Sequence, residues 1–264
     1  MINPYTASRS VEGSPQERNR AWWEALPMTY KDWNAASRST TRDQAVGDFL
    51  SGNPWLTEDL FARQKGKSVL EIGCGTGAAS VLFARAGARV TAIDLTQAAV
   101  DMTLAHTEGL GVAVERMDAE HLAFPDQSFD YVFSWGVLHH SSAPEKAFAE
   151  VARVLKTGGS ALIMVYNRWS ARYWIKGLLR LFFKGDIFRG ETMDSVQRFH
   201  TDGYFHRHFA ASEFSRAVRP LRVTRISYSH MAKKMLPMIP RSLDKFAKRH
   251  WGWFLIAELT KDEG

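Results

Sequence analysis

The sequence contains one cysteine, Cys74, among its 264 residues, and this scarcity excludes a disulfide within the chain. No apolar run approaches the roughly 18 to 20 residues needed to span a bilayer, and the first twenty residues lack the apolar centre of a secretory signal. Because Cys74 lies in a glycine-rich stretch, we interpret it as a small buried residue rather than a reactive thiol. These absences together predict a cytoplasmic protein.

The charge of the chain is unevenly distributed. Residues 1–167 carry 15 Lys and Arg against 19 Asp and Glu, a net −4, whereas residues 168–264 carry 19 against 9, a net +10. A basic half can attract nucleic acid or anionic lipid, but scattered basic residues more often form a solvated surface, which is what we expect here. The composition, 45% hydrophobic and 23% charged, is that of an ordinary globular domain able to bury a core.

A regular alternation of strand and helix patterns begins at Lys67. Apolar runs predict strands at residues 68–72, 89–93, 111–116, 129–134 and 160–166. Helical patterns lie between them at 77–86, at 97–106 with Thr96 as N-cap, and at 144–155, where residues 156–159 form a closing turn. Strands that alternate with helices predict a parallel sheet.

After residue 166 the alternation stops, and it resumes with a helix at 211–217 and strands at 221–228 and 253–259. No clear crossover helix joins these last two strands, so we predict an antiparallel addition at one edge of the sheet.

A glycine-rich turn, Gly73-Cys74-Gly75-Thr76-Gly77, follows the first predicted strand. Glycine accepts positive φ and carries no side chain, so such a turn lets the backbone approach a ligand closely, although dinucleotide sites use similar turns. Two carboxylates favour another ligand. Asp94, at the end of the second strand, is placed to accept hydrogen bonds from ribose hydroxyls, and Glu71 would repel a pyrophosphate but attract the ammonium group of a sulfonium amino acid. The pattern therefore favours S-adenosylmethionine over NAD.

The segment Val69-Leu70-Glu71-Ile72-Gly73-Cys74-Gly75-Thr76-Gly77 resembles the first motif of class I S-adenosylmethionine-dependent methyltransferases. Segments 117–130, 134–140 and 150–159 resemble later motifs of ubiquinone/menaquinone-type small-molecule methyltransferases, in the same order. The resemblance implies that Asp94 binds the ribose and that Asp118 meets the adenine amino group. The cofactor-binding residues that it implies are Glu71, Gly73, Cys74, Gly75, Gly77, Asp94, Leu95, Asp118, Ala119, Glu120, Ser134 and Trp135.

The expected fold is α/β, a doubly wound Rossmann-like sheet of seven mostly parallel strands with an antiparallel edge strand, an N-terminal lid and an inserted helical cap. We divide the chain into an N-terminal arm and aromatic lid (1–42), a Rossmann-like core that binds S-adenosylmethionine (43–166), the cap (167–211) and a C-terminal completion of the sheet (212–264).

Methyl transfer from a sulfonium is a displacement at carbon, so an enzyme mainly has to align the nucleophile, the methyl group and the sulfur. His139 and His140 follow the fourth strand at the edge where such folds bind ligands, and either is a candidate general base or a packing residue. Tyr166 is a further catalytic candidate and Asn167 a candidate substrate contact, because they leave the fifth strand at the same edge.

Residues 1–20 are polar and are expected to be loosely ordered, with structure beginning near Asn19. The aromatic segment that follows resembles the lid over the cofactor in many family members. Trp22, Trp23, Tyr30 and Trp33 are therefore candidate lid or substrate-binding residues, since aromatic faces stabilise a nearby cation, and packing of the arm onto the core is the alternative.

Basic residues recur every four positions from Arg168 to Lys184, and aromatic and aliphatic residues, including the candidate substrate contact Tyr173, fill the other positions. Such a helix either roofs the active site with its apolar side, which we favour, or contacts an anionic membrane surface. Three histidines at 199–209 lack metal-ligand spacing and partner cysteines, so no metal site is predicted, and we interpret them as polar groups of the substrate pocket.

The expected function is methyl transfer from S-adenosylmethionine to an O, N or C nucleophile of a small molecule. A cyclase is the alternative: the amine of the cofactor attacks its own γ-carbon, releasing methylthioadenosine and forming azetidine-2-carboxylate. A non-catalytic binding module is disfavoured by the intact motifs. Nucleic acid is not an expected partner, because residues 134–137 lack the Asn/Asp-Pro-Pro-aromatic motif of base methylation. The acceptor and the oligomeric state are left open.

Overall fold

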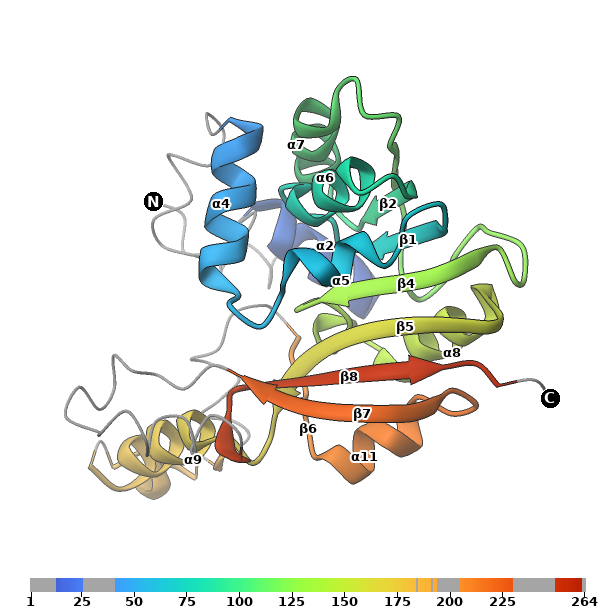
Figure 1. The fold of residues 1–264 in the computed structure, drawn as a ribbon. Coiled ribbons are helices and arrows are strands. Elements are labelled where there is room, and N and C mark those ends of the chain that lie inside the picture. Colours follow the sequence, from blue (N-terminus) through green and yellow to red (C-terminus); the bar gives the residue numbers. More distant parts are fainter. Residues whose placement is uncertain are drawn as a thin grey trace.

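The structure, a computed structural model, describes residues 13–25, 41–183, 185–190, 192–193, 205–229 and 250–262. A single mixed sheet runs through it in the strand order β3-β2-β1-β4-β5-β8-β7, and β6 pairs with β5 outside this path (Figure 1). The strands are β1 (Ser68–Ile72), β2 (Arg89–Asp94), β3 (Ala113–Arg116), β4 (Phe129–Trp135), β5 (Leu155–Asn167), β6 (His208–Phe209), β7 (Arg222–Ser229) and β8 (Phe254–Thr260).

Helices cover the sheet and flank its ends. They are α2 (Pro15–Ala25), α4 (Arg42–Gly52), α5 (Glu58–Ala62), α6 (Ala78–Arg85), α7 (Gln97–Thr107), η2 (Leu138–His140), α8 (Pro144–Val154), α9 (Ala171–Leu178), η3 (Leu179–Phe183), η4 (Asp186–Arg189) and α11 (Ala211–Ala217).

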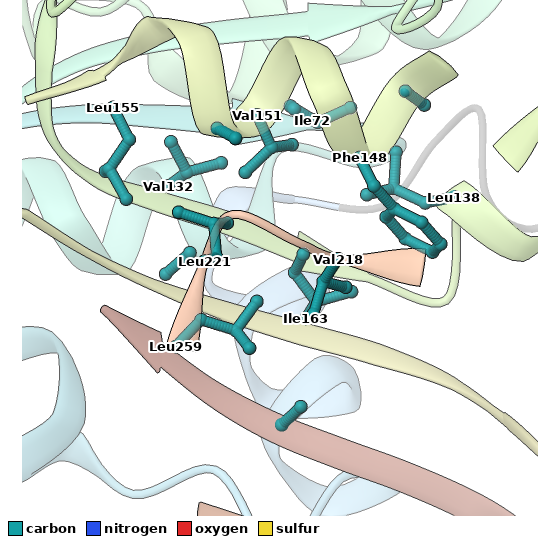
Figure 2. Packing of buried hydrophobic residues seen from close by; sticks show 14 of the residues in the cluster. Ile72, Val132, Leu138, Phe148, Val151, Leu155, Ile163, Val218, Leu221 and Leu259 are labelled. Atoms are coloured by element: carbon teal, nitrogen blue, oxygen red, sulfur yellow. The ribbon is translucent and has the colours of Figure 1, made fainter. Parts of the chain in front are cut away.

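Two hydrophobic clusters occupy the two faces of the sheet, because successive side chains of a strand point to opposite faces. On β1, Leu70 and Ile72 pack toward α8 and α11, whereas Val69 packs on the opposite face beside Phe61 and Phe83 of α5 and α6. Figure 2 shows the first cluster. The predicted layer of helices on each face of a largely parallel sheet is therefore confirmed.

The strand order reverses between β1 and β4, which are neighbours and parallel. At such a point the loops that leave the two strands diverge, and a crevice forms at the carboxyl edge of the sheet. The predicted antiparallel addition is confirmed, since β8 pairs antiparallel with both β5 and β7.

The predicted closing turn after α8 is wrong. The helix ends at Val154 and β5 begins at the next residue. Phe129 and Tyr131 of β4 pair with Leu155 and Ser160, so residues 156–159 bulge out within β5 instead of ending the helix as a separate turn. A bulge of this kind keeps the strand in the sheet while absorbing extra residues.

Helix α2 begins earlier than the sequence analysis placed the first structure. Ser14 Oγ accepts a hydrogen bond from Glu17 N (3.3 Å), and the Glu17 carboxylate accepts one from Ser14 N (2.6 Å). This reciprocal pair is a capping box, and Pro15 occupies the first helical position, where a missing N–H costs nothing. The polar composition of this segment therefore concealed a helix start.

The single helix predicted over residues 168–184 is divided into α9 and a π-helical turn, η3. Further along the chain, β6 joins the sheet beside β5, where Tyr166 pairs with His208 and Asn167 pairs with Phe209. Because β4 pairs with β5 only as far as Met164, β6 takes the position beside β5 beyond the end of β4.

Candidate active site

The turn between β1 and α6, residues 73–77, is held by hydrogen bonds from its neighbours. Gly73 N and Cys74 N donate to Ile93 O of β2 (2.8 and 3.0 Å), and Thr103 Oγ1 of α7 donates to Gly75 O (3.2 Å). Cys74 is a free thiol buried within this turn, as predicted, and burial holds its pKa well above the ordinary value. The turn is therefore rigid before any ligand arrives.

Two of its glycines are required by contacts within the protein. A Cβ on Gly73 would lie 2.1 Å from Val137 Cγ2, and a Cβ on Gly77 would lie 2.9 Å from Thr103 Cγ2. Both glycines also have positive φ, 79° and 75°. These glycines were predicted to allow close approach of a ligand, whereas packing against Val137, just beyond β4, and against Thr103 of α7 also requires a glycine at these two positions.

Glu71 lies near the end of β1 and is buried. Its carboxylate accepts a short hydrogen bond from Ser80 Oγ of α6, and no ion pair within the described residues includes it. Burial raises the pKa of Glu71 to about 8, since the Ser80 hydrogen bond offsets only part of the lost hydration and nearby Asp94 adds to the rise.

Asp94 ends β2 and bridges the glycine turn to α7. Oδ1 accepts hydrogen bonds from Thr96 N (3.0 Å) and Thr96 Oγ1 (2.9 Å), and Oδ2 accepts one from Gly75 N (3.2 Å). Desolvation raises the pKa of Asp94 despite these donors. Thr96 is the N-cap of α7, as predicted, because its Oγ1 accepts from Ala99 N. Leu95, between them, is partly buried.

The loop after β3 carries the next predicted ligands. Asp118 Oδ1 accepts a hydrogen bond from Glu120 N (2.9 Å), and the side chains of Asp118 and Ala119 are partly exposed. Glu120 is buried, and its Oε1 accepts hydrogen bonds from Ser142 Oγ (2.8 Å), Ala143 N (2.9 Å) and Ser141 Oγ. The Glu120 carboxylate thus braces this loop against the start of α8, and its cofactor contact stays a prediction.

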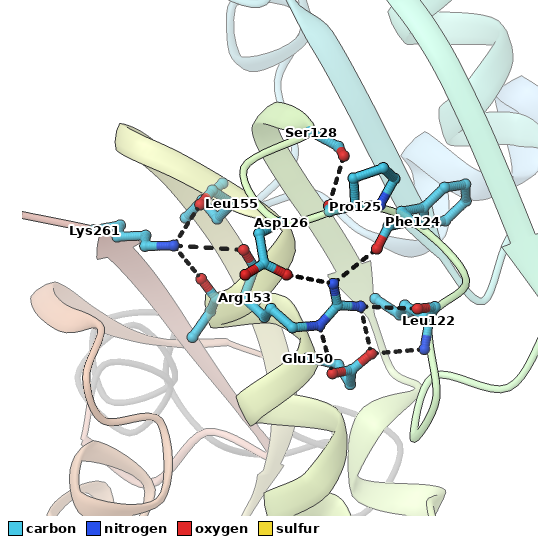
Figure 3. A network of polar contacts seen from close by, with 10 residues as sticks. Leu122, Phe124, Pro125, Asp126, Ser128, Glu150, Arg153, Leu155 and Lys261 are labelled. Carbon is cyan, nitrogen blue, oxygen red and sulfur yellow. Dashed lines mark hydrogen bonds and ion pairs between the residues drawn. The ribbon is translucent and has the colours of Figure 1, made fainter.

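A second set of contacts fixes the same loop to α8 (Figure 3). The Arg153 guanidinium donates to Leu122 O (2.8 Å) and Phe124 O (2.7 Å) and pairs with Glu150 and Asp126. Glu150 in turn accepts from Leu122 N (2.7 Å). Backbone and side-chain groups of the loop are therefore anchored on one helix.

Three carboxylates, those of Glu71, Asp94 and Asp118, thus lie at or just beyond the carboxyl ends of the adjacent strands β1, β2 and β3. None of them forms an ion pair with a cation of the described residues. An edge lined by carboxyl groups repels a pyrophosphate, and an ammonium group that approaches Glu71 favours its ionised form, while the other carboxylates can accept hydrogen bonds from hydroxyl and amino groups. These residues fit S-adenosylmethionine and do not fit NAD.

Helix α2 crosses the loops of this edge as a lid. Gln16 Nε2 donates to Asp118 Oδ1 (2.9 Å), and Asn19 Nδ2 donates to His140 O (2.8 Å). The Glu24 carboxylate accepts from Gln97 N (2.9 Å) and Ala98 N (3.2 Å) at the start of α7. These three polar residues were missed by the sequence analysis, although the capping box of α2 would have indicated the helix.

The aromatic lid candidates have different positions. Trp22 is buried, and the ring of Trp23 lies 5.0 Å from that of His140. Tyr30 and Trp33 lie outside the described residues.

The histidine pair sits in η2, directly after β4. Leu138 points into the hydrophobic cluster beside Phe148, which anchors this turn (Figure 2). His139 is fully buried, and among the described residues neither of its ring nitrogens has a hydrogen-bond partner. Burial lowers the pKa of His139 far below its ordinary value, and the neighbouring imidazoles lower it further. An unpaired buried imidazole costs roughly 1–3 kcal/mol and calls for a ligand atom.

His140 is held in one tautomer. Its Nδ1 lies 2.8 Å from Phe205 O, and since a carbonyl only accepts, Nδ1 carries the proton and Nε2 is left as the acceptor. Burial lowers the pKa of His140 to about 3, although this hydrogen bond favours the protonated form. Both imidazoles are therefore neutral at physiological pH.

Aromatic rings surround the pair in what we term the ring cluster: His139, His140, Tyr166, Tyr173, His208 and Trp253. The ring of Tyr166 lies 4.0 Å from His139 and 4.6 Å from Trp253, and Tyr173 lies 4.8 Å from His208. His208 is one of the three histidines interpreted as substrate-pocket groups, which stays a prediction, and Trp253 was not predicted because no pattern connects residues that meet only through the pairing of β8 with β5.

Three other predicted residues make structural contacts. Ser134 Oγ donates to Ile72 O (3.2 Å), and Trp135 Nε1 donates to Asn53 Oδ1 (2.9 Å). Asn167 is buried, with its Nδ2 donating to Gly252 O (2.9 Å) and its Oδ1 accepting from Trp169 N (3.0 Å). Their roles toward a ligand stay predictions. Within the described ranges, no three His, Cys, Asp or Glu side chains are grouped to hold a metal ion.

Comparison with known proteins agrees with this geometry. Residues 70–163 match the family described as "Methyltransferase domain". The chain is 33% identical over 106 residues to a ubiquinone biosynthesis O-methyltransferase of Coxiella burnetii, covering 39% of this chain and 45% of the relative. It is 32% identical over 149 residues to a phosphatidylethanolamine N-methyltransferase of Cereibacter sphaeroides, covering 53% of this chain and 68% of the relative.

The chain therefore spans less than half the length of the Coxiella relative. Among solved structures, an S-adenosylmethionine-dependent methyltransferase from Mesorhizobium loti matches with a TM-score of 0.56 at 17% identity, covering 83% of this chain and 99% of the other. This likeness shows the fold.

Proposed function

This chain belongs to the methyltransferase domain family, whose cofactor is S-adenosylmethionine, and from that membership we propose that it methylates an oxygen, nitrogen or carbon nucleophile of a small molecule. The observation that carries the proposal is His139, which lies a few residues beyond the end of β4. Its two buried ring nitrogens have no partner among the described residues. Because β4 pairs with β1, His139 lies near the carboxyl-lined edge proposed for the cofactor. Buried polar atoms are almost always paired, so two ring nitrogens without a partner among the described residues support contact with a ligand.

Val137 connects the two halves of the proposed site. It packs directly against Gly73 of the cofactor turn, and only one residue separates it from His139. The acceptor side and the cofactor side are therefore fixed relative to each other by a close packed contact. Such alignment is the main requirement of a displacement reaction.

S-adenosylmethionine supplies, when bound, a methyl carbon activated by a sulfonium. The residues that would hold it are Glu71 at its ammonium group, Asp94 at its ribose and Asp118 at its adenine. The ammonium group would favour the ionised form of Glu71, and the turn of residues 73–77 would lie between these carboxyl groups.

The ring cluster would hold the acceptor. Its imidazoles are neutral, so His139 or Nε2 of His140 can accept a hydrogen bond from an acidic O–H or N–H group and orient the nucleophile. Tyr166 packs against both imidazoles and limits their rotation.

The first test is to incubate the purified chain with S-adenosylmethionine alone and identify the nucleoside released. We expect no turnover without acceptor, and S-adenosylhomocysteine once a panel of phenols, amines and carboxylic acids is added. Methylthioadenosine released without acceptor would overturn methyl transfer in favour of the cyclase.

Two variants test the assigned residues. Asp94→Ala should weaken S-adenosylmethionine binding at least about tenfold in calorimetry, since hydrogen bonds to a charged group contribute about 1.5–3 kcal/mol. Asp101→Ala, which removes an exposed carboxylate from α7, is the matched control. His139→Phe should lower kcat with cofactor affinity unchanged, whereas His121→Phe, on an exposed loop, should not. Equal kcat values would remove His139 from the site.

A further inference from the structure

Exposed large apolar side chains are concentrated in one region of the described chain. Of the ten that are exposed among the described residues, eight lie within residues 169–188, a ninth is Trp251 just before β8, and the tenth is Leu104 of α7. Phe183 is 85% exposed and Phe188 is 90% exposed. Soluble proteins do not gather exposed rings in this way without a partner. We call these eight residues and Trp251 the aromatic face.

This arrangement differs from the roof predicted for the segment. Tyr173 and Leu181 do pack inward, but Trp169, Leu178 and Phe182 remain exposed. Figure 1 places α9 beyond the end of the β5, β8 and β7 strands, away from α4, α6 and α7. The apolar side of the segment is therefore only partly used by the fold.

Three rings of the aromatic face come together from separate parts of the chain. Trp169 and Trp174 stack with ring centroids 5.7 Å apart, and both line an open hollow of about 620 Å³ together with Trp251. On the inner side of α9, Tyr173 belongs to the ring cluster. One short helix thus has the outer face on one side and the proposed acceptor site on the other.

The charge of the segment indicates the partner. Residues 168–189 contain six Lys or Arg and a single acidic residue, Asp186. The segment therefore carries a net charge of +5 (six cations less one anion), and of its cations Arg168 pairs with Glu213 of α11. A second copy docked face to face would bring two such positive segments together, which is unfavourable. An anionic lipid surface supplies both the negative charge and an apolar layer for the rings.

The geometry fits contact with the surface of a bilayer rather than insertion across it. No helix of the described residues has the length and apolarity of a membrane span. Residues 171–183, which form α9 and η3, rise by about 20 Å, against about 30 Å for the hydrocarbon core. Exposed Phe and Trp side chains, together with several Lys and Arg residues, are the composition of a helix that lies in the membrane interface.

We propose that the aromatic face, together with the basic residues of its segment, docks this protein on an anionic lipid surface. This inference goes beyond the proposed methyl transfer and does not rest on it. Docking brings Tyr173 and the ring cluster next to the lipid surface, so an acceptor dissolved in the bilayer would reach the site without crossing water.

The test is sedimentation of the full chain with vesicles of phosphatidylcholine alone or mixed with phosphatidylglycerol, without S-adenosylmethionine. We expect binding to the mixed vesicles that falls steeply as NaCl is raised. Phe183→Ser with Phe188→Ser should lower the partition coefficient at least about tenfold, whereas Leu104→Ser, an exposed leucine on α7, should not change it.

A second pair of variants tests the charge. Arg180→Gln with Lys184→Gln should lower the partition coefficient by about fivefold per residue. Arg63→Gln with Lys65→Gln, which removes the same charge at exposed positions near α5, should leave it unchanged. Circular dichroism of each variant checks that the fold is retained.

Binding that is equal on neutral and mixed vesicles, or unchanged in the phenylalanine variant, would overturn the proposal. So would the absence of vesicle binding combined with a lipid-free dimer in light scattering, because the aromatic face would then join two copies. Since no turnover is measured, failure here leaves the proposed methyl transfer unaffected.

Discussion

Gly73→Ala should destabilise the protein by two separable effects. The backbone of Gly73 has φ of +79°, a conformation that costs a residue with a side chain roughly 1–2 kcal/mol. The new Cβ would also lie 2.1 Å from Val137 Cγ2 and 2.6 Å from Cγ1. Overpacking in a filled site costs about 1–3 kcal/mol. The expected loss in the free energy of unfolding is therefore roughly 2–5 kcal/mol.

Gly109→Ala isolates the backbone effect. Gly109 has φ of +75°, and a Cβ there would meet no atom within 4 Å. Its loss should be only the roughly 1–2 kcal/mol of backbone strain. The difference between the two variants, measured by urea unfolding without cofactor and at unchanged m-value, is the free-energy cost of the contact with Val137.

Val137→Ala, alone and combined with Gly73→Ala, completes a double-mutant cycle. It removes the two nearest atoms and leaves Val137 Cβ at 2.8 Å, so the double variant should recover part of the loss, a coupling of about 1 kcal/mol. If Gly73→Ala were no more destabilising than Gly109→Ala, or if Val137→Ala gave no coupling, the packing explanation of Gly73 would be refuted and ligand approach would again be the reason for this glycine.

Three further predictions follow from the contacts around the site. Arg153→Met should lower the free energy of unfolding by roughly 2 kcal/mol, because the carbonyls of Leu122 and Phe124 lose a charged donor; urea curves that overlap wild type would contradict this. Glu71 has a pKa raised from its ordinary 4.5 to about 8, so its contribution to stability is complete below pH 4.5 and is lost as pH rises through 8. Thermal melts should therefore show Glu71→Gln gaining on wild type across that window, and a constant difference would exclude the shift. Glu24→Ala should loosen α2 and speed tryptic cleavage after Arg18 and Arg20, whereas Glu58→Ala on α5 should not; equal rates would mean that Glu24 does not hold the lid.

The centre of the sheet was predictable from the sequence because β1, β4 and β8 are short, apolar and largely buried. Glu71 and Asp94 were found for the same reason, since their strands end in a recognisable pattern. Helix α4 was missed. It packs Val46 against Ala78 and Val81 of α6, but its own pattern is mostly polar, and its contacts arise only in the folded chain.

Other contacts join segments that are far apart in the sequence and meet only in the folded chain. Glu120 was predicted to contact the cofactor, and this stays a prediction. Its hydrogen-bond partners, residues 141–143, lie 21 to 23 residues later in the sequence, and no local pattern predicts that they approach it. His208 joins the ring cluster through a strand of two residues. Side-chain hydrogen bonds of this kind become visible only when the register of the sheet is known.

Asp118 shows how the lid and the proposed cofactor site share one group. Its Oδ1 already accepts hydrogen bonds from Gln16 of the lid and from Glu120 of its own loop, which uses both lone pairs of that oxygen. If Asp118 binds the adenine amino group as proposed, Oδ2 is the oxygen left for it. We therefore expect α2 to stay docked while the base is bound, so that the proposed lid adds to the binding site instead of competing with it.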